Sequence, residues 1–191
     1  MEHMRIVMSL TVDVDVTRLI RFTRQSGLNF YGVMVWTVSK VVNAHDEFKY
    51  GWSKGGDLIR WEVISPSYVH FHPEDQRFTK LFTPFSPDLA SFHAQFLADK
   101  EAYRDRRDIL PGQAPNFFDV SCLPWVRYRH CDLHVFDDGR FLAPVVTWGK
   151  YEEEQGRWSM PLTMNLHHAV ADGFHLCRFF QETQELIDTL A

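Results

Sequence analysis

The sequence predicts an α/β protein, arranged as a two-layer α+β sandwich in which helices pack on one face of a mixed β-sheet. Apolar residues recur with a period of two in some segments and with a helical period in others, so both strands and helices are expected. These segments do not alternate regularly along the chain, which favours a mixed sheet. Because the chain has 191 residues and is 45% hydrophobic, residues 1–191 are expected to form a single domain with a buried core.

The composition argues against several classes of protein. The formal net charge is −5, and without a basic stripe no nucleic-acid partner is expected. No apolar run approaches the ~20 residues that a membrane span needs, and no signal peptide is visible, so no membrane partner is expected. The three cysteines are odd in number and are not spaced for zinc, which indicates a reducing, cytoplasmic location.

Two helices are expected to follow an N-terminal strand. Residues 4–16 alternate between apolar and polar, which predicts a strand with one buried face. Thr17 is the expected N-cap, and Gly27 the expected stop, of the first helix. Residues 29–44 form the second helix, and its apolar residues spread around the helix, so it is expected to be buried on most sides.

The rest of the chain is expected to form short strands and two further helices. Residues 48–82 read as strands with a turn at Gly55-Gly56, and Pro87 is expected at the first position of the third helix. Further strands are expected over residues 117–125, 131–136, 141–151 and 158–166, with a hairpin turn at Gln155-Gly156. A C-terminal helix is expected over residues 174–190.

The connection between the last strand and the last helix has the sequence His167-His168-Ala169-Val170-Ala171-Asp172-Gly173. Loops held on a rigid scaffold often carry catalytic groups, and a histidine can take and return a proton near neutral pH. A nearby aspartate can bind an imidazole, a backbone group or an arginine, and glycine permits a tight turn. The same residue types also fit a polar loop in which Asp172 caps the helix.

A second pair of histidines, His70 and His72, lies on one face of an expected strand, with a spacing that metal sites use. No cysteine accompanies them, and no carboxylate motif beyond Glu74 does. No metal site is therefore expected.

The string HHAVADGFH at residues 167–175 closely resembles the active-site signature of the chloramphenicol acetyltransferases, within the HHxxxDG superfamily of CoA-dependent acyltransferases. The segment Val120-Ser121-Cys122-Leu123-Pro124-Trp125 resembles the serine segment of that family. Residues 141–147 with Lys150-Tyr151 resemble its central strand and turn, and Ser9-Leu10-Thr11 and Asp46-Glu47-Phe48 resemble weaker landmarks. The resemblance runs in family order from about Met8 to the C-terminus, and it implies the CoA-dependent acyltransferase fold.

The resemblance implies an acetyl-CoA-dependent O-acetyltransferase that acts on a hydroxyl of chloramphenicol, and hence antibiotic resistance. It implies that His168 is the general base, that Ser121 binds the oxyanion, and that Thr147 supports the same intermediate through water. Asp172 matches a buried aspartate that braces the loop. Tyr151 resembles an aromatic contact to the adenine of acetyl-CoA, and Lys150 a neighbour of its phosphates. Acetyl-CoA is a co-substrate, and no permanently bound cofactor or metal is implied.

The family is a homotrimer with each active site between subunits, and the resemblance carries this expectation over. The family also has an N-terminal segment whose arginine pairs with the loop aspartate, and no counterpart precedes the first strand here. We therefore expect either that Asp172 is held by backbone donors and a substitute cation, or that the loop is loosened and activity is weak. A more exposed Asp172 is a further alternative. His175 is better placed than Arg178, because residues three apart are neighbours on a helix.

Two alternatives remain open. Met8 and Cys131 stand where the family tends to have phenylalanines that contact the acceptor, and Asn165 where glutamine is common, so the acceptor could be another small hydroxyl or amine compound. The protein could also be a non-catalytic trimeric binding protein of the same fold. The retained His168, Ser121 and Thr147 argue against this, and the lack of a counterpart to the N-terminal segment argues for it. The acyltransferase core of a dehydrogenase complex shares the motif, but no lipoyl domain or Pro/Ala linker accompanies it here.

Overall fold

The structure, a computed structural model, describes residues 6–107, 114–133, 135 and 139–190. Its elements follow one another in the order β1 (Val7–Asp15), α1 (Thr17–Ser26), α2 (Phe30–Ala44), η1 (Asp46–Phe48), β2 (Tyr50–Trp52), β3 (Leu58–Arg60), β4 (Ser65–His72), β5 (Arg77–Phe82), α3 (Leu89–Ala102), β6 (Phe117–Leu123), β7 (Val145–Gly149), β8 (Glu152–Glu154), β9 (Arg157–His167) and α4 (Gly173–Thr189). Within these residues, no helix is both long and apolar enough to span a membrane.

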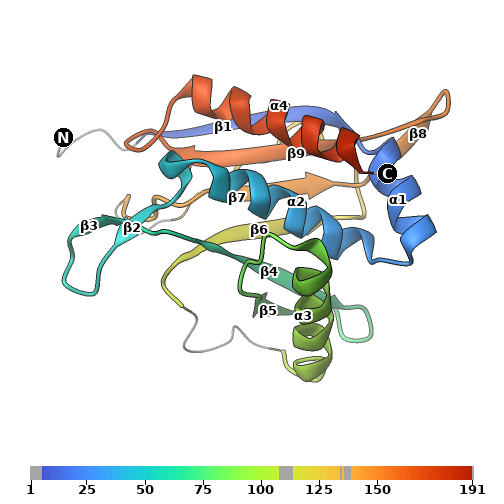
Figure 1. The fold of residues 1–191 in the computed structure, drawn as a ribbon, viewed down its shortest axis with the longest axis horizontal. Helices are drawn as coiled ribbons and strands as arrows, with labels where there is room; N and C mark the ends of the chain where they lie inside the picture. Colours follow the sequence, from blue (N-terminus) through green and yellow to red (C-terminus); the bar gives the residue numbers. More distant parts are fainter. Residues whose placement is uncertain (1–5, 108–113, 134, 136–138, 191) are drawn as a thin grey trace.

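One mixed sheet of seven strands organises the molecule (Figure 1). Its order is β1-β9-β7-β6-β4-β5, with β8 also paired to β9, while β2 and β3 form a separate hairpin. The β4–β6 and β6–β7 pairs are parallel, and the other pairs of this sheet are antiparallel. Because Val7 is opposite His167, the loop after β9 emerges beside the start of β1.

The helices cover one face of this sheet, as predicted (Figure 1). α2 packs against both α3 and α4, and α4 also contacts β1. Val146, Trp148, Leu162 and Met164 of β7 and β9 are buried in the same apolar core as the helices. Since successive side chains of a strand point to opposite faces, the intervening residues of β7 and β9 face away from the helices.

Several local predictions are confirmed. α2 is buried on most sides, as its apolar pattern predicted. α1 ends at Gly27, which has a φ of 72° that favours glycine. The β8–β9 hairpin turns at Gln155 and Gly156, whose φ values of 53° and 82° match the two-residue turns that connect twisted strands.

Three local predictions are wrong. Thr17 is the first helical residue and not the N-cap, because its hydroxyl accepts a hydrogen bond from a backbone N–H of β9 instead. Pro87 precedes α3, which Asp88 caps with its carboxylate. The strand expected over residues 131–136 is not formed at 131–133 or 135, where the Cys131 carbonyl accepts from a β1 side chain; residues 134 and 136 lie outside the described residues.

Candidate functional site

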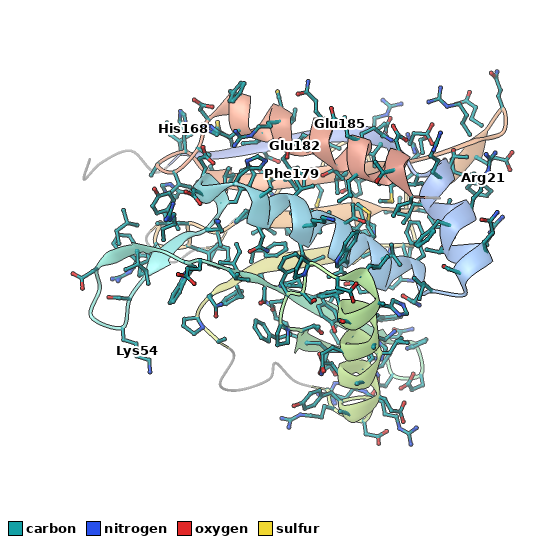
Figure 2. All side chains as sticks on the ribbon, viewed as in Figure 1. Arg21, Lys54, His168, Phe179, Glu182 and Glu185 are labelled. Atoms are coloured by element: carbon teal, nitrogen blue, oxygen red, sulfur yellow. The ribbon has the colours of Figure 1, made fainter. Side chains whose placement is uncertain are left out.

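The turn between β9 and α4 is held by hydrogen bonds at both ends. The N–H of His168 donates to the carbonyl of Ile6 at 2.8 Å, which extends the pairing of β1 with β9. The N–H of Val170 donates to the carbonyl of His167, and Asp172 caps α4. Figure 2 shows His168 on this turn, beside the start of α4.

An internal hydrogen bond orients the ring of His168. Its Nδ1 lies 2.8 Å from the carbonyl oxygen of Ala171. A carbonyl can only accept, so Nδ1 carries the proton and Nε2 of the neutral ring keeps its lone pair. Ala171 is buried whereas His168 is exposed, so a fixed acceptor holds a ring that solvent and ligands can reach. This geometry suits a general base whose active nitrogen is Nε2.

The structure corrects one expectation about Asp172, because its carboxylate is more than half exposed and not buried. It accepts from the backbone N–H groups of Phe174 and His175, and it lies 2.7 Å from Nδ1 of His175. The hydrogen bond with the His175 side chain is the main cause that holds the pKa of Asp172 below its usual value. The prediction of backbone donors with His175 is confirmed, and Arg178 instead binds Glu47.

Hydroxyl side chains form a row across the sheet face that lies away from the helices. Ser121 and Thr147 are directly opposite each other on the parallel strands β6 and β7. Thr147 is opposite Thr163 on β9, and Thr163 is opposite Thr11 on β1. Directly paired residues point to the same side of a sheet, so these four residues, which we call the hydroxyl row, share one face. The fold thus brings together Ser121 and Thr147, the two residues expected to act on one intermediate.

The side chain of Tyr128 contacts two residues of the hydroxyl row, Thr147 and Thr163. Its hydroxyl donates to the carbonyl of Thr147 at 2.8 Å and accepts from Oγ1 of Thr163 at 3.0 Å. Burial raises the pKa of Tyr128 well above its usual value, which keeps this hydroxyl a neutral donor. The Thr147 hydroxyl itself is buried and has no hydrogen-bond partner among the described residues. A buried hydroxyl without a hydrogen bond lowers the stability of the fold. Thr147 nevertheless keeps such a hydroxyl beside Ser121.

One chain does not bring His168 near Ser121. Thr163, which faces Thr147, lies five residues before His168, so the two are separated by roughly 16 Å along β9 at about 3.3 Å per residue. Ser121 lies two strands away from β9, which adds about 10 Å across the sheet. The resulting Cα separation is about 19 Å. No side chain spans that distance, so His168 and Ser121 of one chain, the expected base and the expected oxyanion donor, cannot serve the same reacting atom.

Tyr151 follows the C-terminal end of β7, which is the end away from His168, and lies next to a hollow of about 440 Å³. Its ring contacts those of Phe30 and Trp158, with centroids 5.1 Å and 5.5 Å away. Arg24 and Asn29 also line this hollow. Lys150 is half exposed, and its ammonium lies 3.6 Å from Glu152. Tyr151 thus presents an aromatic wall to an accessible space, with cationic groups nearby.

The sequence did not single out Tyr128 or Thr163, and it marked Glu47 only as part of a weaker family landmark, with no role. Thr163 alternates with apolar residues in β9, so its face was predictable, but its neighbours on β7 and β1 were not. Tyr128 lies in an irregular segment after β6 that has no periodic pattern. The contact of Glu47 with α4 joins segments that are far apart in the sequence.

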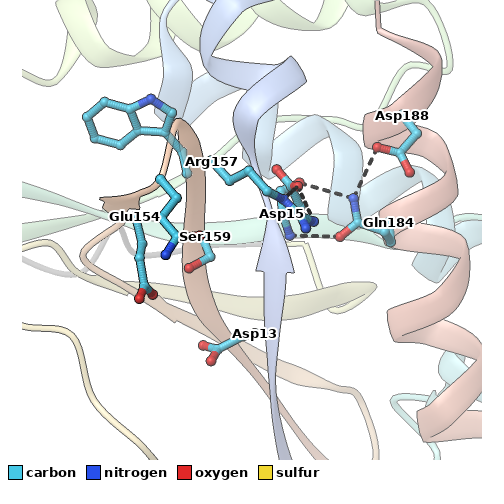
Figure 3. Close-up of a pocket in the computed structure, with 9 residues that line it drawn as sticks. Asp13, Asp15, Glu154, Arg157, Ser159, Gln184 and Asp188 are labelled. Carbon is cyan, nitrogen blue, oxygen red and sulfur yellow. Dashed lines mark hydrogen bonds and ion pairs between the residues drawn. The ribbon is translucent and has the colours of Figure 1, made fainter.

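A separate polar hollow of about 690 Å³ lies where β1 and β9 meet the end of α4 (Figure 3). Its carboxylates have partners: Asp15 binds Arg157 at 2.7 Å, and Asp13 binds Arg127 at 2.7 Å. Gln184 connects the β1 end to α4 by accepting from the Asp15 N–H. None of the residues that resemble the family's active site lines this hollow.

His70 and His72 stack edge to face on β4, with ring centroids 4.5 Å apart. Nε2 of the buried His72 lies 2.8 Å from the hydroxyl of Thr79, a partner within the fold. Burial is the main cause that lowers the pKa of His70 to about 4. Across the described part of the chain, no group of three or more metal-ligating side chains comes together.

Known proteins share both the sequence and the fold of this chain. Residues 1–184 match the sequence profile of the family described as "Chloramphenicol acetyltransferase". A chloramphenicol acetyltransferase of Streptomyces acrimycini is 39% identical over 184 residues, which cover 94% of this chain and 82% of that protein. One of Clostridium perfringens is 33% identical over 184 residues, which cover 95% of this chain and 84% of that protein.

Solved structures agree on the fold. A chloramphenicol acetyltransferase structure superposes with a TM-score of 0.85 at 20% identity, and the match covers 95% of this chain and 88% of that chain. A dihydrolipoamide acetyltransferase of Azotobacter vinelandii superposes with a TM-score of 0.73 at 14% identity, and the match covers 97% of this chain and 82% of that chain. At these identities the likeness concerns the fold alone.

Proposed function

The chain belongs to the chloramphenicol acetyltransferase family, and we propose that it transfers the acetyl group of acetyl-CoA to a hydroxyl of chloramphenicol. The observation that carries the proposal is the hydrogen bond from Nδ1 of His168 to the Ala171 carbonyl. It leaves Nε2 as the nitrogen that takes the proton of the acceptor hydroxyl while that oxygen attacks the thioester. The ring then returns the proton to the thiolate of coenzyme A.

Ser121 and Thr147 are proposed to stabilise the tetrahedral oxyanion. They are cross-strand neighbours, and in the described part of the chain no group hydrogen-bonds the Thr147 hydroxyl. Donors aimed at charge that develops only in the transition state lower the barrier without tightening the binding of substrate. Ser121 donates directly, and Thr147 acts through a bridging water. Both keep their positions because they lie on central strands of the sheet.

We infer that the working protein is a homotrimer in which each active site combines His168 of one chain with Ser121 of the next. The separation of about 19 Å within one chain supports this, because both residues must reach the same acetyl group. Exposed apolar residues also gather near the catalytic turn: Ile6, Val7, Leu133 and Val135. Beside them lies Asn165, which is 1% exposed and whose amide nitrogen and oxygen form no hydrogen bond with the residues that the structure describes. A neighbouring chain would cover the apolar surface.

Acetyl-CoA is the proposed co-substrate, with its adenine on the ring of Tyr151. The hollow beside Tyr151 is large enough for part of a nucleotide, and Arg24, which lines it, is a cation that can bind phosphates. Lys150, the residue before Tyr151, is half exposed and is proposed as a second phosphate neighbour. The free thiols Cys122, Cys131 and Cys177 agree with the reducing cytoplasm in which we propose the reaction takes place.

The test is release of free thiol from acetyl-CoA, with and without chloramphenicol, by the wild type and by His168→Ala. We expect thiol release that depends on chloramphenicol and falls by about 10²–10⁴-fold in the variant. Tyr151→Ala serves as a second arm, in which the KM for acetyl-CoA should rise more than kcat falls. Equal thiol release by the wild type and by His168→Ala would contradict the assignment of the base.

A second acceptor class is favoured by one observation. Cys131 is a half-buried residue near the hydroxyl row, since its carbonyl accepts from Ser9, which shares a face of β1 with Thr11. Met8 lies on the other face of β1 and packs against the core. Cys131 does not offer the aromatic surface that an aryl antibiotic would stack on. If the wild type releases thiol with another small alcohol or amine and not with chloramphenicol, this second candidate replaces the first.

A further inference from the structure

A line of charged contacts joins the segment around η1 to one face of α4. His45 and Glu182 are 2.6 Å apart, and Glu47 contacts Arg178 at 3.2 Å and His175 at 3.1 Å. His175, Arg178 and Glu182 are three and four residues apart, so they lie on the same side of the helix. We call these five residues the η1–α4 seam. Figure 2 shows Glu182 on α4, in the turns that follow the catalytic turn of His168.

The first residue of the seam on α4, His175, is held at both of its ring nitrogens. Nε2 lies 3.1 Å from Oε1 of Glu47, and Nδ1 lies near Asp172. Nδ1 can donate to the Asp172 carboxylate at 2.7 Å when the ring is charged, or accept from the Asp172 N–H at 3.2 Å when it is neutral. Glu47 accepts from Nε2–H in both states. Glu47 therefore sets the orientation of the His175 ring whether or not Nδ1 carries a proton.

The peptide unit that links Ala171 to Asp172 connects the two histidine rings. Its carbonyl accepts from Nδ1 of His168, and its N–H points to Nδ1 of His175. A peptide unit is planar and rigid, so the orientation of one end fixes that of the other. A rotation of the His175 ring would tilt this peptide and with it the acceptor that holds His168.

Glu47 itself is anchored to the core. The neighbouring Phe48 is fully buried and packs edge to face on Phe179 of α4, with ring centroids 6.2 Å apart. Partial burial alone would raise the pKa of the Glu47 carboxyl. A hydrogen bond from its own backbone and the nearby Arg178 and His175 outweigh this and hold the pKa below its usual value. Glu47 thus remains an ionised acceptor at neutral pH.

We propose that Glu47 is a positioning residue of the acetyl-transfer site, acting on the base His168 through His175 and the Ala171–Asp172 peptide. This inference rests on the proposed function only for the role of His168. Glu47 lies on η1 and is proposed to act only through His175, without contacting either substrate.

The test compares Glu47→Leu with Glu47→Gln and with Glu182→Leu. Leucine removes the acceptor for Nε2–H, and we expect kcat to fall on the order of ten- to hundred-fold with the KM for acetyl-CoA unchanged. Glutamine keeps an acceptor oxygen and should restore most of the lost kcat. Glu182→Leu breaks the neighbouring carboxylate–imidazole pair of the same seam and should lower the melting temperature to a similar extent without lowering kcat.

A second readout separates this proposal from the proposed function. Nitrogen NMR of the histidine rings should show His168 as the Nδ1–H tautomer in the wild type and in Glu182→Leu, and as a mixture of tautomers in Glu47→Leu. An unchanged His168 tautomer and an unchanged kcat in Glu47→Leu would overturn the positioning role. A wild type that transfers no acetyl group would refute the function instead, while the NMR comparison would still test Glu47.

Discussion

Mixing two inactive variants should restore activity, because each active site is proposed to draw its two key groups from different chains. His168→Ala removes the base, and Ser121→Ala removes the oxyanion donor. Each variant alone should lose about 10²–10³-fold or more in kcat. Within one chain, the two positions are about 19 Å apart, as their register on β6 and β9 requires.

The expected recovery follows from the composition of mixed trimers. When the two variant chains are present in equal amounts and assemble at random, each site takes its base-bearing chain and its serine-bearing chain independently. Half of the choices on each side are competent, so about one quarter of the wild-type specific activity should return over all closed rings of three chains. Purification through both tags removes the rings made of a single variant, and each remaining ring has one competent site in three, so about one third should return in the purified sample. If one chain supplied both groups, the mixture would stay as inactive as its components.

The assay is co-expression of the two variants with different affinity tags, purification through both tags, and measurement of chloramphenicol-dependent thiol release. Sedimentation of the same sample gives its oligomeric state. A dual-tagged oligomer that shows no more activity than the single variants would refute the shared site. A sample that sediments only as monomer at micromolar concentration would refute the trimer.

Three further outcomes are expected. Ser121→Ala should lower kcat on the order of 10²–10³-fold with little change in KM, because it acts in the transition state, and steady-state kinetics would detect the opposite pattern of a binding residue. Gly149→Ala should lower the free energy of unfolding by about 1–3 kcal/mol in urea titrations, since an added Cβ would lie 2.8 Å from the ring of the facing proline on β9. Partial burial raises the pKa of Asp15, but hydrogen bonds from Thr17 and Arg157 outweigh it and hold the pKa below its usual value. Asp15 therefore stabilises the fold above its unfolded pKa of about 4 and loses this effect as the pH falls. Asp15→Asn should accordingly be less stable than the wild type at pH 7 and approach it in acid; a constant difference across that range would refute the pH argument.

Local patterns were sufficient where a segment depends mainly on its own residues. The period-two alternation predicted the first strand correctly, although within β1 only Val14 is fully buried and Met8, Leu10 and Val12 are partly buried against the core. The all-round apolar character of α2 predicted its burial correctly. Gly27 and the Gln155-Gly156 turn were predictable because few residues adopt a positive φ. Thr17 is not the N-cap because its hydroxyl accepts a hydrogen bond from a backbone N–H of β9, which is remote in the sequence.

The sequence by itself determined the class of the fold, the family and the residues most open to a catalytic role, since these depend on periodicity and on motifs read along the chain. The tertiary structure alone decided how those residues are grouped. Pairing between distant strands placed Ser121 opposite Thr147 and kept both far from His168, and no local pattern encodes such register. The same holds for Asp172: its resemblance predicted a buried carboxylate, but the position of α4 left it exposed, with His175 as its partner and Glu47 behind that ring.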